Sequence, residues 1–519
     1  MSNNRLTRSE RAIINLFTSV LAWGWPVLLA LVVAPTLVRG LGDSSYGIRG
    51  LAMALVGYFA ILDLGLNGAV TKYLAEYVAK DEKALIEELL GTTLLTYVVV
   101  GLIGGGSIWA LANWFSTSVF SVPVSFRHES ILAFRITGVG FFFSMLIWWG
   151  SAIPAGVQRF DVFNFISIAF GTITSVASVV AIWMGWGLLG VIGANVAANI
   201  FTAAAYFVAA RRLLPSIRIV PCFRLKMFKR TAVFGSYMML FRISALIFSQ
   251  ADRFVIGTIL GPAVLTFYLI PNQLSSVVHQ ISAKMMQIIF PMASEFSALN
   301  ERDKIKKLFL RGMNLSFAVG VGLALPIFTL STPILTYWMS QQVANESTMV
   351  LQLLTIMYLL ASLAALPSSL LSGVGFPQIP PIAAAITGVS GLFGYLVCIR
   401  TWGIRGVALA SVVSMALGII FYLLVSKHLI GVSLSELAYA ALRPLLIAFL
   451  IGTAVLEFLE FRVDNLLSTI VLFLSIDVVY AVACWLSGVL DDREKRYLLD
   501  FAGRFFNKTR ASASVRSLK

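Results

Sequence analysis

Charged side chains are scarce in this sequence: only 12% of its 519 residues are Asp, Glu, Lys or Arg. A soluble chain carries about 25%, so the surface that this chain can present to water is unusually small. Hydrophobic residues make up 59% of the sequence, and the mean hydropathy is +0.88. The scarcity of charge excludes an ordinary soluble domain.

Motifs for metals and nucleotides are missing as well. The three cysteines, Cys222, Cys398 and Cys484, lie far apart with no C-x-x-C spacing, which indicates neither a disulfide framework nor a zinc site. No Gly-Lys dipeptide occurs, so the chain has no Walker A loop. We therefore expect no metal, no other cofactor and no ATPase activity.

What the sequence does contain is long uncharged runs. Residues 162–210 and 347–399 hold no Asp, Glu, Lys or Arg, and each run is long enough for two membrane helices of about 20 residues. The runs are continuous, which favours helices over the alternating pattern of a β-barrel. We predict an all-α polytopic membrane protein with about 14 transmembrane helices. The predicted spans are 15–38, 46–72, 89–115, 130–155, 162–184, 187–210, 232–260, 264–292, 311–339, 348–372, 379–400, 404–426, 440–458 and 466–489.

Lys and Arg are distributed unevenly over the loops between these spans. With the N-terminus in the cytoplasm, 28 of the 39 Lys and Arg residues fall on the cytoplasmic side and five on the opposite side. Cytoplasmic loops carry such an excess, so the bias predicts that both termini are cytoplasmic. It also explains the net charge of +15 without a nucleic-acid partner. We interpret the densest basic cluster, within residues 211–230, as a topology signal that contacts anionic lipid.

The basic cluster separates two halves with matching motifs. The Leu-Gly pair at 41–42 matches the pair at 260–261 at an offset of 219, and the Trp-Gly pair at 186–187 matches the pair at 402–403 at an offset of 216. The nearly constant offset predicts two parallel six-helix repeats with a substrate path between them, and a C-terminal helix pair. The predicted domains are an N-lobe (1–210), a basic cytoplasmic linker (211–231), a C-lobe (232–427), a helix hairpin (428–490) and a basic cytoplasmic tail (491–519).

Ionisable residues within the predicted spans are the main functional clue. A charge in hydrocarbon is costly, so by default it faces a wet cavity or a partner. The eighth span carries Gln273, Ser276, Gln280 and Lys284 along one helical face. The ionisable residues within the spans are Arg49, Asp63, Arg135, Arg242, Asp252, Arg253, His279, Lys284, Arg443 and Asp477.

Basic side chains outnumber acidic ones in this set. They are expected at different depths, which predicts a basic ladder through the membrane that suits an anion. The candidate substrate-binding residues are Arg49, Arg242, Arg253, Lys284, Gln273 and Gln280, and the candidates for proton coupling are Asp63 and His279.

Structural roles compete with these interpretations. Arg49, Arg135 and Arg443 lie near span ends, where an arginine can extend its head group to the interface. Asp252 has an alternative role as the partner of a neighbouring helix, and His279 has one as an interhelical hydrogen-bonding residue. Both roles stay open for each residue at this point.

Short motifs along the chain resemble a known transporter family. The motifs are Leu41-Gly42 with Tyr46-Gly47, Leu62-Asp63-Leu64-Gly65-Leu66, Lys72-Tyr73-Leu74-Ala75-Glu76-Tyr77, and Ala251-Asp252-Arg253-Phe254 with Leu260-Gly261. With these motifs, the sequence resembles, across about residues 10–490, the polysaccharide-export (Wzx-like) branch of the multidrug/oligosaccharidyl-lipid/polysaccharide (MOP) exporter superfamily.

The resemblance implies two six-helix lobes in a V around a cationic central cavity. It implies a flippase, not an enzyme, that moves undecaprenyl-diphosphate-linked oligosaccharide from the cytoplasmic to the periplasmic leaflet of a bacterial inner membrane. The step would serve O-antigen or exopolysaccharide assembly by alternating access. In that picture the basic candidate residues contact the diphosphate or acidic sugars. The implied partners are the lipid-linked oligosaccharide, membrane lipid and the polysaccharide polymerase machinery.

Three other functions are weighed against this one. A drug exporter of the same fold needs an acidic or aromatic cavity for cationic drugs. The related lipid II flippases have arginines in span 1, which carries no charge here. A membrane enzyme would need a sizeable loop or clustered carboxylates for acid–base work, and the loops are short. We therefore favour the oligosaccharide flippase.

Overall fold

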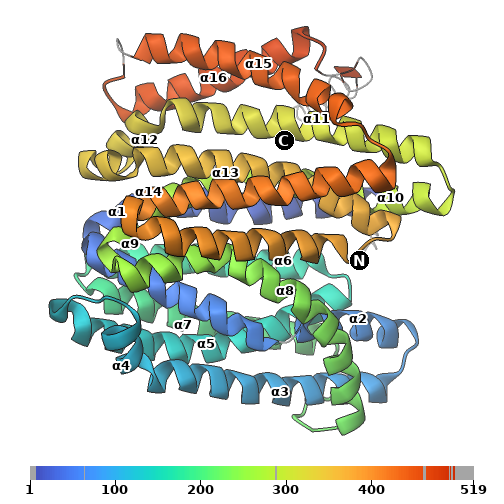
Figure 1. The fold of residues 1–519 in the computed structure, drawn as a ribbon. Coiled ribbons are helices and arrows are strands. Elements are labelled where there is room, and N and C mark those ends of the chain that lie inside the picture. The colour runs from blue at the N-terminus through green and yellow to red at the C-terminus, as the bar shows by residue number, and fades with distance from the viewer. Residues whose placement is uncertain are drawn as a thin grey trace, which may run out of the picture. The chain divides into compact units, whose positions relative to one another are not determined.

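The computed structural model describes residues 8–63, 65–286, 289–459, 463–489, 491 and 495–496, with side chains described except at 8–23, 236–249, 434, 437–441 and 458–459. Every element in these ranges is helical (Figure 1). The longer helices are α1 (Arg8–Phe59), α3 (Lys83–Ala110), α5 (Arg127–Gly156), α6 (Phe160–Trp183), α7 (Gly187–Leu213), α8 (Leu225–Ile259), α9 (Pro262–Met286), α11 (Arg302–Thr329), α13 (Gln341–Val374), α14 (Ile379–Ile430), α15 (Leu434–Leu459) and α16 (Leu466–Leu486). The shorter elements are η1 (Ala60–Asp63), α2 (Leu66–Ala79), α4 (Ala112–Trp114), η2 (Phe115–Val119), η3 (Val124–Phe126), α10 (Ile289–Ala298) and α12 (Ser331–Trp338).

Nine helical segments of the described chain are long and apolar enough to cross a membrane. The predicted class, an all-α polytopic membrane protein, is confirmed. The 14 predicted spans do not correspond one to one with these segments, because α1 and α14 each run for 52 residues. At 1.5 Å per residue each would be roughly 78 Å long, more than twice the thickness of the hydrocarbon core. Each is interrupted by one non-helical glycine, Gly42 (φ 74°) or Gly403 (φ 56°), where the sequence separates two spans.

The chain forms two compact units. The first contains residues 1–274 and 384–414, and the second contains 275–383 and 415–519. In the first unit, glycines bring α3 and α5 together. A Cβ atom added to Gly105 would lie 2.4 Å from the carbonyl oxygen of Gly138, and one added to Gly138 would lie 2.6 Å from that of Gly105. Small residues of this kind allow the backbones of membrane helices to approach closely.

The basic segment between α7 and α8 is fixed to α3 in the same unit. The backbone N–H of Arg218 donates to Oε1 of Glu87 at 2.7 Å, and the N–H of Cys222 donates to the carbonyl of Gly91 at 3.3 Å. Ile217 is buried while Arg218 is exposed. The segment is therefore attached to the first half of α3, with basic side chains turned outward.

A basic and aromatic cluster joins α2 to the start of α8. The guanidinium carbon of Arg230 lies 4.7 Å from the centroid of the Tyr73 ring, and a terminal nitrogen lies 3.6 Å from Oε1 of Glu76. Nζ of Lys72 lies 4.3 Å from the centroid of the Phe234 ring. Cations over ring faces are attracted by the ring quadrupole. Residues 72–77, one of the motifs of the family resemblance, thus anchor the beginning of α8.

In the second unit, an ion pair and a helix cap hold the start of α15 against α11. Nζ of Lys306 lies 2.8 Å from Oε1 of Glu436, while the backbone N–H of Ser433 donates to Oε2 at 2.8 Å. The Ser433 hydroxyl accepts from the N–H of Glu436 at 3.2 Å, which completes a capping box. The Lys306 ammonium and the Ser433 N–H together lower the pKa of Glu436 to about 2.

This pKa predicts acid sensitivity of the second unit. A carboxylate whose pKa is lowered by folding stabilises the fold above its unfolded pKa of 4.5, and loses that contribution as pH falls toward 2. We expect the thermal midpoint of purified protein to fall between pH 4.5 and pH 2. Glu436→Gln should lower the midpoint slightly at pH 7, because exposed pairs contribute little, and should flatten this acid response. An equal acid response in wild type and variant would contradict the assignment.

Candidate functional site

Helices α1 and α8 of the first unit carry two of the predicted basic residues and pack closely together. A Cβ atom added to Gly257 of α8 would lie 2.3 Å from Cδ2 of Leu51 in α1. One added to Gly57 of α1 would lie 3.3 Å from Cδ of Gln250 in α8. These two glycines bring Arg49 of α1 and Arg253 of α8 into the same part of the unit.

Both arginines interact with the hydroxyl of Tyr46. The guanidinium of Arg49 lies 5.8 Å from the centroid of the Tyr46 ring and donates a hydrogen bond to its hydroxyl. The charge of Arg253 also acts on this hydroxyl. Tyr46 itself is buried, with 4% of its surface exposed. The structure therefore brings Arg49 and Arg253 together around one buried tyrosine.

Two side chains of α8 fix Arg253 in place. Its Nη1 donates to Oε1 of Gln250 at 3.2 Å. The neighbouring carboxylate of Asp252 is buried, accepts the backbone N–H of Arg253 at 2.8 Å, and is hydrogen-bonded by Tyr268 of α9. Asp252 also contacts the neighbouring helix α9, as its alternative structural role requires.

The sequence interpretation missed Tyr46 and Gln250. Each lies three residues before an arginine of the cluster, Arg49 or Arg253, and residues three apart share a helix face. That spacing was the available signal. Tyrosine and glutamine are uncharged at neutral pH, so a search for charged residues within the predicted spans does not find them.

The two guanidiniums keep unused hydrogen-bonding capacity. Nε of Arg49 and Nε of Arg253 are both buried, and neither has a hydrogen-bond partner in the described part of the chain. Buried donors are almost always paired, and leaving one unpaired costs about 1–3 kcal/mol, more for a charged group. A bound anion would satisfy both donors.

In the second unit, α9 carries two more of the predicted residues in different surroundings. The ring of His279 stacks on Tyr358 of α13 at 6.5 Å between centroids and hydrogen-bonds the backbone of Ala361. Nε2 of Gln280 donates to Oγ of Ser276 at 3.0 Å, one turn earlier in the same helix. His279 thus makes interhelical contacts, and Gln280 lies on the expected polar face with Ser276.

The remaining predicted residues are placed separately. Lys284 lies exposed in the last turn of α9, and Gln273 is half-buried in the part of α9 that belongs to the first unit. The side chain of Arg242 lies outside the described residues, although the backbone there is part of α8.

Asp63 is buried in the turn between α1 and α2. It is 1% exposed, accepts a hydrogen bond from the hydroxyl of Tyr97 in α3, and accepts the backbone N–H of Asn67 at 3.4 Å. The amide of Asn67 donates to the carbonyl of Trp148 in α5 at 2.6 Å. Asp63 and Asn67, two polar residues of the second predicted span, therefore form hydrogen bonds with the neighbouring helices α3 and α5. Asp63 stabilises the start of α2 in addition to any role in coupling.

Comparison with known proteins agrees with this membrane architecture. The chain is 24% identical over 410 residues, 77% of its length and 93% of the relative's, to a Shigella flexneri protein named "Putative O-antigen transporter". It is 21% identical over 520 residues, 97% of its length and 99% of the relative's, to "Uncharacterized membrane protein EpsK" of Bacillus subtilis (strain 168).

Solved structures share the fold at low identity. The lipid II flippase MurJ in an inward closed conformation aligns with a TM-score of 0.71 and 13% identity, over 92% of this chain and 100% of MurJ. An inward-facing multidrug resistance MATE family transporter of the MOP superfamily aligns with a TM-score of 0.63 and 16% identity, over 79% of this chain and 98% of that one. The fold is that of the MOP superfamily, as the sequence motifs predicted.

A family model shows to which family the chain belongs. The model described as "Polysaccharide biosynthesis protein" matches residues 36–345, more than half of the chain. This range contains α1 from Thr36 onward and all of α8, and so the arginine cluster. The chain is a multi-pass membrane protein of the polysaccharide biosynthesis (Wzx-like) family, a family of transporters and not of enzymes.

Proposed function

We propose that the protein is a flippase for undecaprenyl-diphosphate-linked oligosaccharide in surface polysaccharide assembly. The observation that carries the proposal is the pair of half-buried arginines around Tyr46, Arg49 and Arg253, each with a buried Nε that has no hydrogen-bond partner in the described residues. A diphosphate supplies the oxygens that such donors lack, and Arg can bind phosphate oxygens bidentately. Family membership and the relative named as an O-antigen transporter support a substrate built from sugars.

The neighbouring residues have distinct roles in this proposal. Gln250 and Tyr46 orient the guanidiniums of Arg253 and Arg49. Asp252 accepts the backbone N–H of Arg253 and is hydrogen-bonded by Tyr268, which ties α8 to α9 beside the two arginines. The lipid tail stays in the bilayer, so the cluster has only to compensate the desolvation of the head group. Arg242, Lys284, Gln273 and Gln280 are proposed to extend the path.

Alternating access between two lobes is the proposed mechanism, with the domain boundaries predicted from the sequence. Backbone geometry supports two related halves, because residues with positive φ recur at offsets of 216 to 219. Such φ values are uncommon outside glycine. The pairs are Gly42 (74°) and Gly261 (85°), Asp81 (53°) and Asn300 (57°), Gln158 (59°) and Gly375 (108°), and Gly187 (56°) and Gly403 (56°).

The setting of the proposed transporter follows from the charge distribution. We place it in a bacterial inner membrane with both termini cytoplasmic, because Lys and Arg concentrate on that side. The exposed basic residues of the segment fixed to α3 are proposed to contact anionic lipid. Asp63 and His279 stay the candidates for coupling to protons, and the polymerase machinery is the proposed acceptor of the product.

The test is direct observation of substrate movement. Purified protein in proteoliposomes, with an imposed ion gradient, should expose a fluorescent undecaprenyl-diphosphate oligosaccharide to the opposite leaflet faster than empty liposomes do. Two substrates with different glycans keep a mismatched sugar from hiding the activity. Movement of neither substrate would contradict the proposal, and drug sensitivity of a deletion strain would then favour the drug exporter. Movement of lipid II alone would favour the lipid II flippase.

A further inference from the structure

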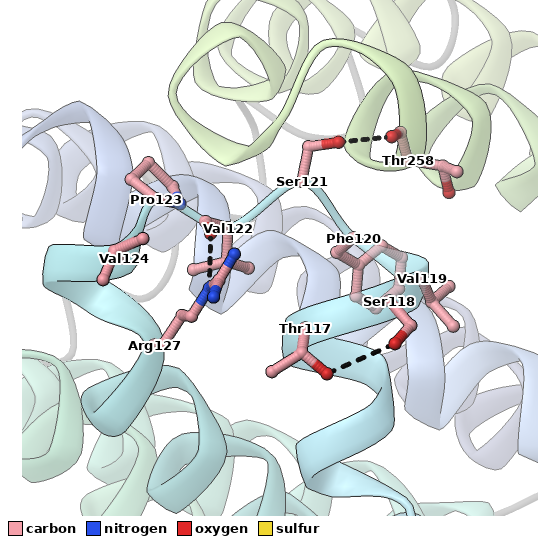
Figure 2. Close-up of a pocket in the computed structure, with 10 residues that line it drawn as sticks. All are labelled: Thr117, Ser118, Val119, Phe120, Ser121, Val122, Pro123, Val124, Arg127 and Thr258. Carbon is pink, nitrogen blue, oxygen red and sulfur yellow. Dashed lines mark hydrogen bonds between the residues drawn. The ribbon is translucent and has the colours of Figure 1, made fainter.

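A concave pocket lies between η2 and α5, beyond the C-terminal end of α3, and Thr258 of α8 contributes to it (Figure 2). It has a volume of about 390 Å³, within the usual range for small-molecule sites. Ten residues line it: residues 117–124, Arg127 and Thr258. All of them belong to the first unit. With α3 roughly 42 Å long, the pocket and the basic segment are separated by the thickness of a membrane.

Helix α8 and an aromatic cluster make this pocket rigid. The backbone N–H of Ser121 donates to the carbonyl of Gly257 at 3.2 Å, and its hydroxyl donates to the carbonyl of Thr258 at 2.7 Å (Figure 2). The Phe120 ring packs on Phe254 with centroids 5.5 Å apart. The π-helical turn η2 ends at Phe120, and such turns are frequent at functional sites. The pocket is thus formed before any ligand binds.

Arg127 gives the pocket a positive charge. Its Nε donates to the carbonyl of Val122 at 3.4 Å, which holds the guanidinium at the pocket (Figure 2). None of the ten lining residues is acidic. Arg127 is also the first residue of α5, where the helix dipole disfavours a cation and favours an anion. Arg127 therefore does not stabilise α5 through the helix dipole, and its charge is available to an anion.

The other polar groups of the pocket are hydroxyls. Thr117, Ser118 and Ser121 contribute side chains to the lining, together with Thr258. Oγ1 of Thr258 is buried and has no hydrogen-bond partner in the described residues. Val124, 75% exposed, adds an apolar edge. A guanidinium, several hydroxyls and an apolar edge match a ligand that carries one anionic group among hydroxyls and C–H faces.

We infer that this pocket binds an acidic sugar, with its carboxylate on Arg127 and its hydroxyls on the serine and threonine side chains. The inference rests on the proposed function, since the sugar would belong to the transported glycan. With the basic segment in the cytoplasm, the pocket opens on the periplasmic side. It would then hold the glycan as it leaves the transporter.

The test measures binding of glucuronate to the purified full-length protein by ligand-observed NMR, with glucose as the matched neutral sugar. We expect a Kd on the order of 1 mM for glucuronate and at least about tenfold weaker binding of glucose. Arg127→Gln should weaken glucuronate binding by a similar factor, while Arg127→Lys should retain part of it. Arg400→Gln, at an exposed arginine of the same unit, is the control and should leave the Kd unchanged.

Three outcomes would overturn the inference. They are equal binding of glucuronate and glucose, an unchanged Kd in folded Arg127→Gln, and no glucuronate binding by wild type. In nanodiscs, loss of glucuronate binding on adding phosphatidylglycerol would assign the pocket to a lipid head group instead. Flipping without sugar binding would leave the proposed function standing, whereas sugar binding without flipping would remove the proposed function alone.

Discussion

Replacing Arg253 with glutamine is expected to slow movement of the lipid-linked oligosaccharide at least about tenfold while the amount of folded protein stays the same. Glutamine removes the charge and the paired donors, and leaves the helix intact. A hydrogen bond to a charged group contributes about 1.5–3 kcal/mol, and each 1.4 kcal/mol corresponds to a factor of ten. The measurement is the rate of leaflet exposure in proteoliposomes with equal amounts of protein.

Arg135 of α5 provides the matched control for this variant. Its Nε is also buried without a hydrogen-bond partner in the described residues, but its guanidinium lies 4.9 Å from the ring centroid of Trp109. Arg135 contacts Trp109 and lies outside the cluster around Tyr46, so Arg135→Gln should change the rate less than about twofold. Equal losses in the two variants would show a general need for intramembrane charge. An unchanged rate in Arg253→Gln would remove it from the substrate site.

Gly105→Leu is expected to prevent stable packing of α3 on α5. The first added carbon would lie 2.4 Å from the carbonyl oxygen of Gly138. Because the obstacle is backbone and not a flexible side chain, the two helices must separate. Overpacking typically costs about 1–3 kcal/mol, and a backbone clash belongs at or beyond the upper end of that range. Monodisperse protein recovered by size-exclusion chromatography should fall to about a tenth or less.

Gly106→Leu separates this effect from the loss of a helical glycine. Gly106 is the next residue of the same helix, is exposed, and has no atom within 4 Å of an added Cβ. The change in helix propensity is the same at both positions, whereas only Gly105 faces α5. We expect near wild-type recovery for Gly106→Leu. Similar recovery of the two variants would contradict the close contact between α3 and α5.

Uncharged runs and short glycine-containing motifs were enough to predict the membrane class and the positions at which helices are interrupted. Uncharged runs fix the class because no soluble fold tolerates so little charge. The Leu-Gly and Trp-Gly pairs marked the breaks at Gly42 and Gly403, since a left-handed residue interrupts a helix and glycine adopts that conformation without a Cβ penalty. The family resemblance, drawn from short motifs that include Leu41-Gly42, is confirmed by the match over residues 36–345.

The contacts that surround Arg253 could not be predicted from the sequence. Intramembrane charge pointed to Arg49 and Arg253, but which helices pack together depends on glycines such as Gly57 and Gly257, whose contacts have no sequence signature. Polar side chains at helical spacing look the same in sequence whether they face water or, as Asn67 does, the backbone of another helix. The pocket at Arg127 lay in a loop interpreted only as a connection.

The recurring positive φ values bear on how the chain evolved. If the two halves descend from one duplicated gene, these left-handed corners are positions at which both copies keep the same sign of φ. Two corners kept glycine in both copies, at Gly42 and Gly261 and at Gly187 and Gly403. A third pairs Gln158 with Gly375, so the backbone angle outlasted the residue that adopts it most easily. In this chain, the left-handed corners are therefore the positions at which to look for a common origin of the two halves.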